Sequence, residues 1–164
     1  MTIILKNKAT LRFDDFYFKC SIGKKGLTKK KIEGDKKTPV GLFSLGNLYY
    51  RADRNLKPLT KLKCIKIKKL MGWCDDIKSK KRYNKIININ QKLRHEKLYR
   101  KDYKYDLMIP INYNTQKTKI GKGSAIFLHL TKNYKPTAGC IALKKKDFLI
   151  MLRLINKKTK IRLA

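Results

Sequence analysis

A histidine and a cysteine in the last third of the chain have the types and spacing of a base and its nucleophile. His129 lies near the end of an apolar run, Cys140 follows Gly139, and ten residues separate the two. A free thiol is mostly protonated at neutral pH, and an imidazole that removes its proton leaves a thiolate able to attack a carbonyl carbon. The pair therefore predicts acyl transfer through a thioester, with Cys140 as nucleophile and His129 as base.

The residues just before Cys140 suit the stabilisation of an oxyanion. A glycine at position 139 lets the backbone turn sharply, so that the amides of Gly139, Cys140 and Ala138 can point at one spot. The hydroxyl of Thr137 is placed to contact the same region. Loss of one such donor typically costs about 3–4 kcal/mol in the barrier. We therefore expect Thr137, Ala138 and Gly139 to belong to the site.

The imidazole of His129 also needs a group that orients it. No acidic residue is close in sequence, so a backbone carbonyl such as that of Leu130 is the expected partner. The same two side chains also suit a protein core, because free cysteine is among the most buried residue types and a cysteine with a histidine is a weak signal alone. The residue pattern by itself leaves both interpretations open.

The other cysteines do not form a recognisable metal or redox motif. Cys20, Cys64 and Cys74 lack close C-x-x-C spacing, and the chain holds only two histidines, so we expect no metal ion and no cofactor. A disulfide among these three cysteines is left open. Cys74 precedes two acidic residues, which raise the pKa of a thiol, so Cys140 is the preferred nucleophile.

The chain is strongly basic. Its 43 Lys and Arg against 11 Asp and Glu give a net charge of +32, spread along the sequence without a basic arm. This charge indicates either a polyanionic partner or a lysine-rich composition without a specific role. A basic nucleic-acid-binding protein is therefore an alternative. However, helix-turn-helix, zinc-finger and RNP motifs are absent, so no specific nucleic acid is expected.

The elements that position these residues are mainly strands. Apolar patterning predicts two or three short strands within 2–20 and further strands at 42–50, 62–67, 105–111, 124–130 and 158–163. One helix is predicted over 144–155, where Phe148, Leu149, Leu152 and Ile155 share a face. The polar stretch 78–104 is expected to be partly helical and to form a lid or a substrate wall.

This order of elements predicts a single domain, residues 1–164, that is rich in β-sheet. No apolar stretch approaches the roughly 18 residues of a membrane span, and the first residues show no secretory signal. The sequence gives no indication of oligomeric state.

Three segments together resemble the catalytic domain of the YkuD-type L,D-transpeptidases. These are Gly123-Ser124-Ala125-Ile126-Phe127-Leu128-His129, then Pro136-Thr137-Ala138-Gly139-Cys140-Ile141-Ala142-Leu143, and the earlier Lys37-Thr38-Pro39-Val40-Gly41. The family pattern places a histidine at a strand end before Ser or Thr, any residue, Gly and Cys. The resemblance implies a YkuD-like β-sandwich with a few short helices, including one near the C-terminus. It assigns Cys140 as nucleophile, His129 as base and Thr137-Ala138-Gly139 as the oxyanion-side loop.

In this family the cysteine attacks a carbonyl of a peptidoglycan stem peptide, and the acyl group passes to an amine of a second stem. The resemblance therefore implies 3-3 or 1-3 cross-links, with hydrolysis by an L,D-carboxypeptidase or amidase as the alternative outcome. It also implies a place in the periplasm or cell envelope, although no signal peptide is visible and a cytoplasmic site is left open. The expected partner is peptidoglycan.

Departures from the common family pattern indicate a different substrate pocket. Ala138, Leu130 and Ala142 stand where many members have His or Arg, Gly, and Arg or Asn. The chain is similar to a proteobacterial subgroup with Pro-Thr-x-Gly-Cys-x-Ala-Leu and Gly-Trp-Cys-Asp-Asp segments.

Four further residues lie in segments that resemble this subgroup, and they are the hypotheses for substrate binding. Arg51 or Arg54 would hold a stem carboxylate by a two-pronged contact, Trp73 would wall the pocket, and Tyr50 lies beside the arginines. Core packing for Trp73 and a solvated surface for the arginines are the alternatives.

Overall fold

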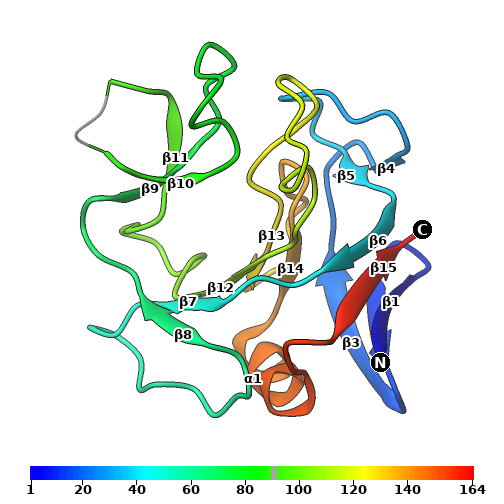
Figure 1. Ribbon diagram of the computed structural model, residues 1–164. Helices are drawn as coiled ribbons and strands as arrows, with labels where there is room; N and C mark the ends of the chain where they lie inside the picture. The colour runs from blue at the N-terminus through cyan, green and yellow to red at the C-terminus, as the bar shows by residue number, and fades with distance from the viewer. Residues whose placement is uncertain (90–91) are drawn as a thin grey trace.

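The computed structural model describes residues 1–89 and 92–164 (Figure 1). The fold is mainly β, with 36% of residues in strands and 6% in helix, as the sequence predicted. Ten strands form one curled sheet. In spatial order they are β6 (Gly41–Ser44), β15 (Lys160–Leu163), β1 (Thr2–Lys6), β2 (Thr10–Phe13), β3 (Phe16–Ser21), β14 (Ile141–Leu143), β13 (Phe127–Leu130), β12 (Leu107–Pro110), β7 (Leu48–Tyr50) and β8 (Cys64–Lys66).

Two small units stand beside the central strands. One is a three-stranded antiparallel sheet of β10 (Ile86–Asn88), β9 (Met71–Cys74) and β11 (His95–Lys97), and the other is the parallel pair β4 (Leu27–Thr28) and β5 (Thr38–Pro39). In Figure 1 the small sheet lies at the upper left and the pair at the upper right, with β13 and β14 between them. This arrangement places the two small units on either side of the central strands.

The main core lies between the curled sheet and α1 (Lys145–Leu154), which packs at the lower end of the sheet in Figure 1. Phe148, Met151 and Leu152 form the buried face of the helix. Asp147 lies in its first turn, where a negative charge suits the helix dipole. In β1 the burial alternates with a period of two, so that Ile3 and Leu5 face the core.

The predicted strands at both ends of the chain and the predicted helix are confirmed. The expected strand over 42–50 is interrupted between β6 and β7, and the strand over 124–130 begins only at Phe127. Ala125 explains the late start, because its φ of +52° is not strand geometry.

The expected helical content within 78–104 is wrong for the described residues, and residues 90–91 of that stretch lie outside them. Turns and two three-residue strands, β10 and β11, occupy the stretch. Both strands pair with β9, so tertiary pairing decides the local structure. None of the described helices has the length and apolar content needed to cross a membrane.

Candidate active site

The two central strands bring His129 and Cys140 to one cavity. β13 and β14 are parallel neighbours, with His129 opposite Ala142, and Cys140 is the residue directly before β14. Because side chains two residues apart share a face of a strand, Cys140 and Ala142 lie on the same side as His129. All three line a cavity of about 740 Å³.

The thiol of Cys140 is buried and held by two backbone groups. The Phe127 amide donates to Sγ at 3.3 Å, and Sγ donates to the Ala125 carbonyl at 3.2 Å. Only 8% of the residue is exposed, and burial raises the pKa of the thiol to about 12. The thiol therefore rests in its protonated form.

The imidazole of His129 is oriented by its own neighbour. Nδ1 lies 3.0 Å from the Leu130 carbonyl oxygen, which can only accept, so Nδ1 carries the proton and Nε2 is the basic nitrogen. The ring packs against the edge of Tyr105 at 5.5 Å, and burial lowers the pKa of His129 to about 4. His129 and Cys140 are therefore both neutral at pH 7. Among the residues that the structure describes, no hydrogen bond joins these two side chains.

The loop before Cys140 is closed by the Thr137 hydroxyl. Thr137 Oγ1 donates to the Cys140 carbonyl at 2.6 Å and accepts from the Gly139 amide at 3.1 Å. Gly139 has a φ of +138°, and a Cβ there would lie 2.8 Å from the Lys37 carbonyl oxygen, so the turn requires glycine. The Gly139 amide, one of the expected oxyanion donors, is already bonded within the loop.

The Thr-Pro-x-Gly segment supports this loop from behind. Thr38 is fully buried, and its Oγ1 donates to the Gly139 carbonyl at 2.8 Å while accepting from the Gly23 amide at 2.9 Å. The loop is also tied to the end of β3, where the Thr137 amide donates to the Ile22 carbonyl at 2.9 Å. These contacts fix the peptide that precedes the nucleophile.

Charged side chains of both signs line the rest of the cavity. The basic ones are Lys31, Lys36, Arg94, Arg100, Lys104 and Lys135, and the acidic ones are Glu33, Asp75 and Glu96. They come mainly from the segments on either side of the central strands. The cavity therefore suits a ligand that carries both carboxylate and ammonium groups.

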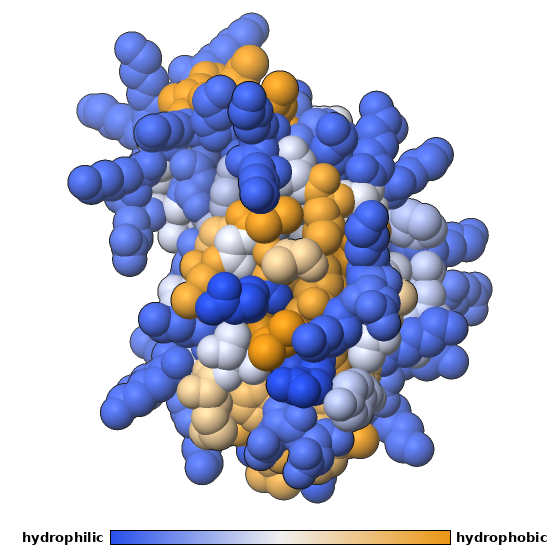
Figure 2. All heavy atoms as spheres, turned by 90° about the vertical axis from the view of Figure 1, so that its right-hand side faces the viewer, coloured by the Kyte–Doolittle hydropathy of each residue, from blue (hydrophilic) through white to orange (hydrophobic). Residues whose placement is uncertain are grey.

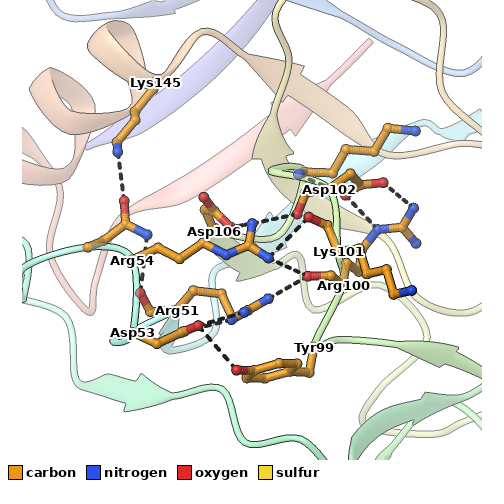
Figure 3. Close-up of polar contacts among 11 residues, drawn as sticks. Arg51, Asp53, Arg54, Tyr99, Arg100, Lys101, Asp102, Asp106 and Lys145 are labelled. Atoms are coloured by element: carbon orange, nitrogen blue, oxygen red, sulfur yellow. Dashed lines mark hydrogen bonds and ion pairs between the residues drawn. The ribbon is translucent and has the colours of Figure 1, made fainter.

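Arg51 and Arg54 do not line this cavity. Arg51 forms a two-pronged ion pair with Asp53 at 2.8 and 2.7 Å, and its guanidinium stacks 3.5 Å from the Tyr99 ring centroid. Both arginines donate to the Arg100 carbonyl (Figure 3). The guanidinium groups of both arginines donate to other parts of the protein. They therefore hold the segment that forms the cavity wall and do not face a ligand.

Tyr50 and Trp73 also lie outside the cavity lining. Tyr50 belongs to the main core at the end of β7, with 4% of the residue exposed. Trp73 packs edge-on against Phe127 at 5.2 Å, and its Nε1 donates to Asn84 Oδ1 at 2.9 Å. Trp73 thus supports β13 from the small sheet.

Sequence reasoning missed several cavity residues. Glu96 lines the cavity and accepts from the Tyr105 hydroxyl at 3.0 Å and from Arg100 at 3.2 Å. Lys31 also lines the cavity. No local motif marks these residues, because their places depend on contacts between distant segments.

The remaining cysteines lie away from this geometry. Cys20, Cys64 and Cys74 are free thiols and are not among the residues that line the cavity. Burial raises the pKa of Cys20 to about 12 and also raises that of Cys74. Among the described cysteines, Cys140 alone shares a cavity with a histidine.

Comparison with known proteins gives a family and similar solved structures. The family model of the L,D-transpeptidase catalytic domain, YkuD, matches residues 1–163. The crystal structure of the helical cell shape determining protein Pgp2 from Campylobacter jejuni is similar, with a TM-score of 0.56 and 20% identity, over 98% of this chain and 46% of that one. The crystal structure of a lysine-to-alanine mutant of Pgp2 gives a TM-score of 0.53 and 21% identity, over 98% of this chain and 45% of the mutant's chain. The chain thus spans less than half the length of these structures, and no curated protein sequence matches it.

Proposed function

The chain belongs to the YkuD family of L,D-transpeptidase catalytic domains, and we propose that its Cys140 transfers acyl groups between peptidoglycan stem peptides. The observation that carries this proposal is the placement of Cys140 and His129 on one face of β13 and β14, in one cavity lined by charges of both signs. Stem peptides carry carboxylates and amines, which match that lining. We place the reaction at the cell envelope, where its substrate lies.

In the first half-reaction, Nε2 of His129 removes the thiol proton as Sγ attacks the carbonyl carbon of a donor stem. The Sγ–C bond forms, the C–N bond breaks, and His129 returns the proton to the departing amine. Because the resting pair is neutral, proton transfer accompanies the attack instead of preceding it. The product is a thioester on Cys140.

The tetrahedral intermediate needs a donor for its oxygen. We assign this role to the Cys140 amide, because the Gly139 amide is bonded to Thr137. Thr38 and Thr137 then act by holding the turn in place through Gly139 and the Cys140 carbonyl.

In the second half-reaction, an amine of an acceptor stem attacks the thioester carbonyl carbon, with Nε2 of His129 removing a proton from the amine. The C–N bond forms, the C–S bond breaks, and His129 returns the proton to Sγ, which leaves a 3-3 or 1-3 cross-link and the free thiol. Water in place of the amine gives a shortened stem instead, as in an L,D-carboxypeptidase. Both outcomes use the same cysteine and histidine, so the products decide between them.

The test is to incubate the purified protein with disaccharide-peptide muropeptides and to analyse the products by fragment mass spectrometry. We expect cross-linked dimers with the wild type and with Cys64→Ala, which removes a partly exposed thiol outside the cavity. Cys140→Ala should give none. Shortened monomers without dimers would show that the protein hydrolyses stem peptides instead of transferring acyl groups. An active Cys140→Ala variant would refute the proposal.

A further inference from the structure

Lys31 is a buried cation at the wall of the cavity. Its side chain is only 3% exposed, and Nζ forms an ion pair with Asp35, whose side chain is 15% exposed. Nζ also lies 3.4 Å from the Ile32 carbonyl oxygen. Lysine is rarely buried, because removing its charge from water costs free energy that an ion pair only partly offsets.

Lys31 lies between the two segments that hold the thiol. A Cβ on Gly123 would lie 2.6 Å from Lys31 Cγ, and a Cβ on Gly139 would lie 3.6 Å from Nζ. Gly123 begins the segment whose Ala125 carbonyl accepts from Cys140 Sγ, and Gly139 directly precedes Cys140. The two glycines therefore leave the space that the lysine side chain fills.

Asp35 is fixed as the counter-ion of this lysine. Its carboxylate accepts from the backbone amides of Ile32 and Lys37, both at 2.9 Å. Burial acts to raise the pKa of Asp35, but these amides and Lys31 hold it below its ordinary value. Asp35 is thus a carboxylate at neutral pH, and Nζ of its partner Lys31 lies beside Gly139, the residue before Cys140.

We propose that the Lys31–Asp35 pair tunes the charge at Cys140, with the Lys31 ammonium stabilising the negative charge that develops on Sγ as His129 removes the thiol proton. Lys31 is a positioning residue in this sense, because it acts through Cys140. The proposal rests on Cys140 as the proposed nucleophile and adds the group that makes its deprotonation less costly. Asp35 opposes this effect and holds the ammonium in place.

The other charged and titratable groups around the thiol act in known directions. Glu96, from β11, disfavours the thiolate, whereas Lys31 favours it. His129 and Tyr105 are neutral at pH 7, since burial lowers the pKa of the imidazole and raises that of the phenol. Lys31 is therefore a cation that acts against Glu96 and burial at Cys140, together with the Phe127 amide, while the pKa of the thiol stays raised.

The pH dependence of Cys140 alkylation by iodoacetamide tests this proposal without any turnover. The rate is followed by mass spectrometry of the peptide that contains Cys140, which separates it from the other cysteines. For Lys31→Met we expect about tenfold slower alkylation between pH 7 and pH 9, where the lysine ammonium of the wild type is charged. For Asp35→Asn we expect faster alkylation over the same pH range. Lys30→Met, an exposed lysine one residue away, should match the wild type.

The opposite signs expected for the two rate changes separate an effect of charge from an effect on folding. A purely structural pair would change the alkylation rate of both variants in the same direction, and that result, or an unchanged rate in Lys31→Met, would overturn the proposal. Lys31→Arg keeps the charge and should keep the wild-type rate. If Lys31→Met does not fold, an unchanged rate in Lys31→Arg together with a faster rate in Asp35→Asn still tests the effect of the charge. Opposite rate changes without muropeptide turnover would uphold this inference while refuting the proposed function.

Discussion

Burial acts in opposite directions on the two central side chains. It raises the pKa of Cys140 to about 12 and lowers that of His129 to about 4, so both are neutral over the pH range between these values. A neutral imidazole with its proton on Nδ1 is a competent base at Nε2. The cavity thus keeps the Cys140 thiol protonated at neutral pH.

The depressed pKa of His129 makes the stability of the fold depend on pH. The folded state keeps the ring neutral down to about pH 4, whereas the unfolded chain protonates it near its ordinary value of 6.5. The contribution of the neutral His129 ring to the free energy of unfolding is therefore complete above pH 6.5. It falls by on the order of 3 kcal/mol as the pH drops towards 4. Urea unfolding at pH 7.5 and 4.5 measures this change.

The His129→Gln variant is the control, because it keeps a polar side chain and removes the titration. It should lose less stability than the wild type over the same pH interval, while the carboxylates contribute equally to both. Equal losses in the two proteins would show that His129 is not buried as a neutral ring.

The sequence predicted that Cys140 and His129 lie close together, but it did not predict the side chains that surround them. Spacing and glycine placement predicted Cys140 near His129, and the structure places both in one cavity. Lys31 and Glu96 could not be predicted, because each reaches the cavity through pairing of distant segments. Lys31 and Glu96 are far from Cys140 in the sequence, and no helical or strand periodicity links them to it.

Among the elements, the segment between β11 and β12 depends on the loop after β7. Arg51 and Arg54 donate to the Arg100 carbonyl, and Arg54 also pairs with Asp106 at 3.2 Å (Figure 3). The segment so held carries Arg100 and Tyr105 into the cavity wall. The arginine loop thus shapes the site from outside it.

Arg51→Ala should lower the free energy of unfolding by about 2 kcal/mol, because it removes charged hydrogen bonds and the stacking on Tyr99. It should also increase hydrogen exchange in residues 99–106. Arg153→Ala, on the exposed side of α1, is the matched control and should have little effect. If the two variants are equally stable, the network does not hold the wall.

The sequence predicted the longer elements and missed the short ones. The helix and the end strands have clear periodicity, whereas β10 and β11 have three residues each and lie in polar sequence. Such strands form because β9 offers them a partner on both edges. The helix expected within 78–104 was therefore replaced by pairing that local propensity does not reveal.

For the whole molecule, the net charge of +32 is distributed over the surface rather than concentrated in the site. Figure 2 shows hydrophilic side chains projecting from much of the face that lies on the right of Figure 1, with apolar patches between them. The cavity instead combines six basic with three acidic side chains. A surface charge of this kind raises the rate of encounter with any acidic polymer, and the proposed function gives the mixed charges of the cavity the separate task of binding a stem peptide.

The most direct test of the central claim is the intact mass of the protein after brief mixing with a stem tetrapeptide and an acid quench. We predict a gain equal to the acyl part of the donor, on the peptide that contains Cys140, and its release by hydroxylamine as expected for a thioester. The Cys140→Ala variant should show no gain. An adduct on another residue, or turnover without any dependence on Cys140, would contradict the account.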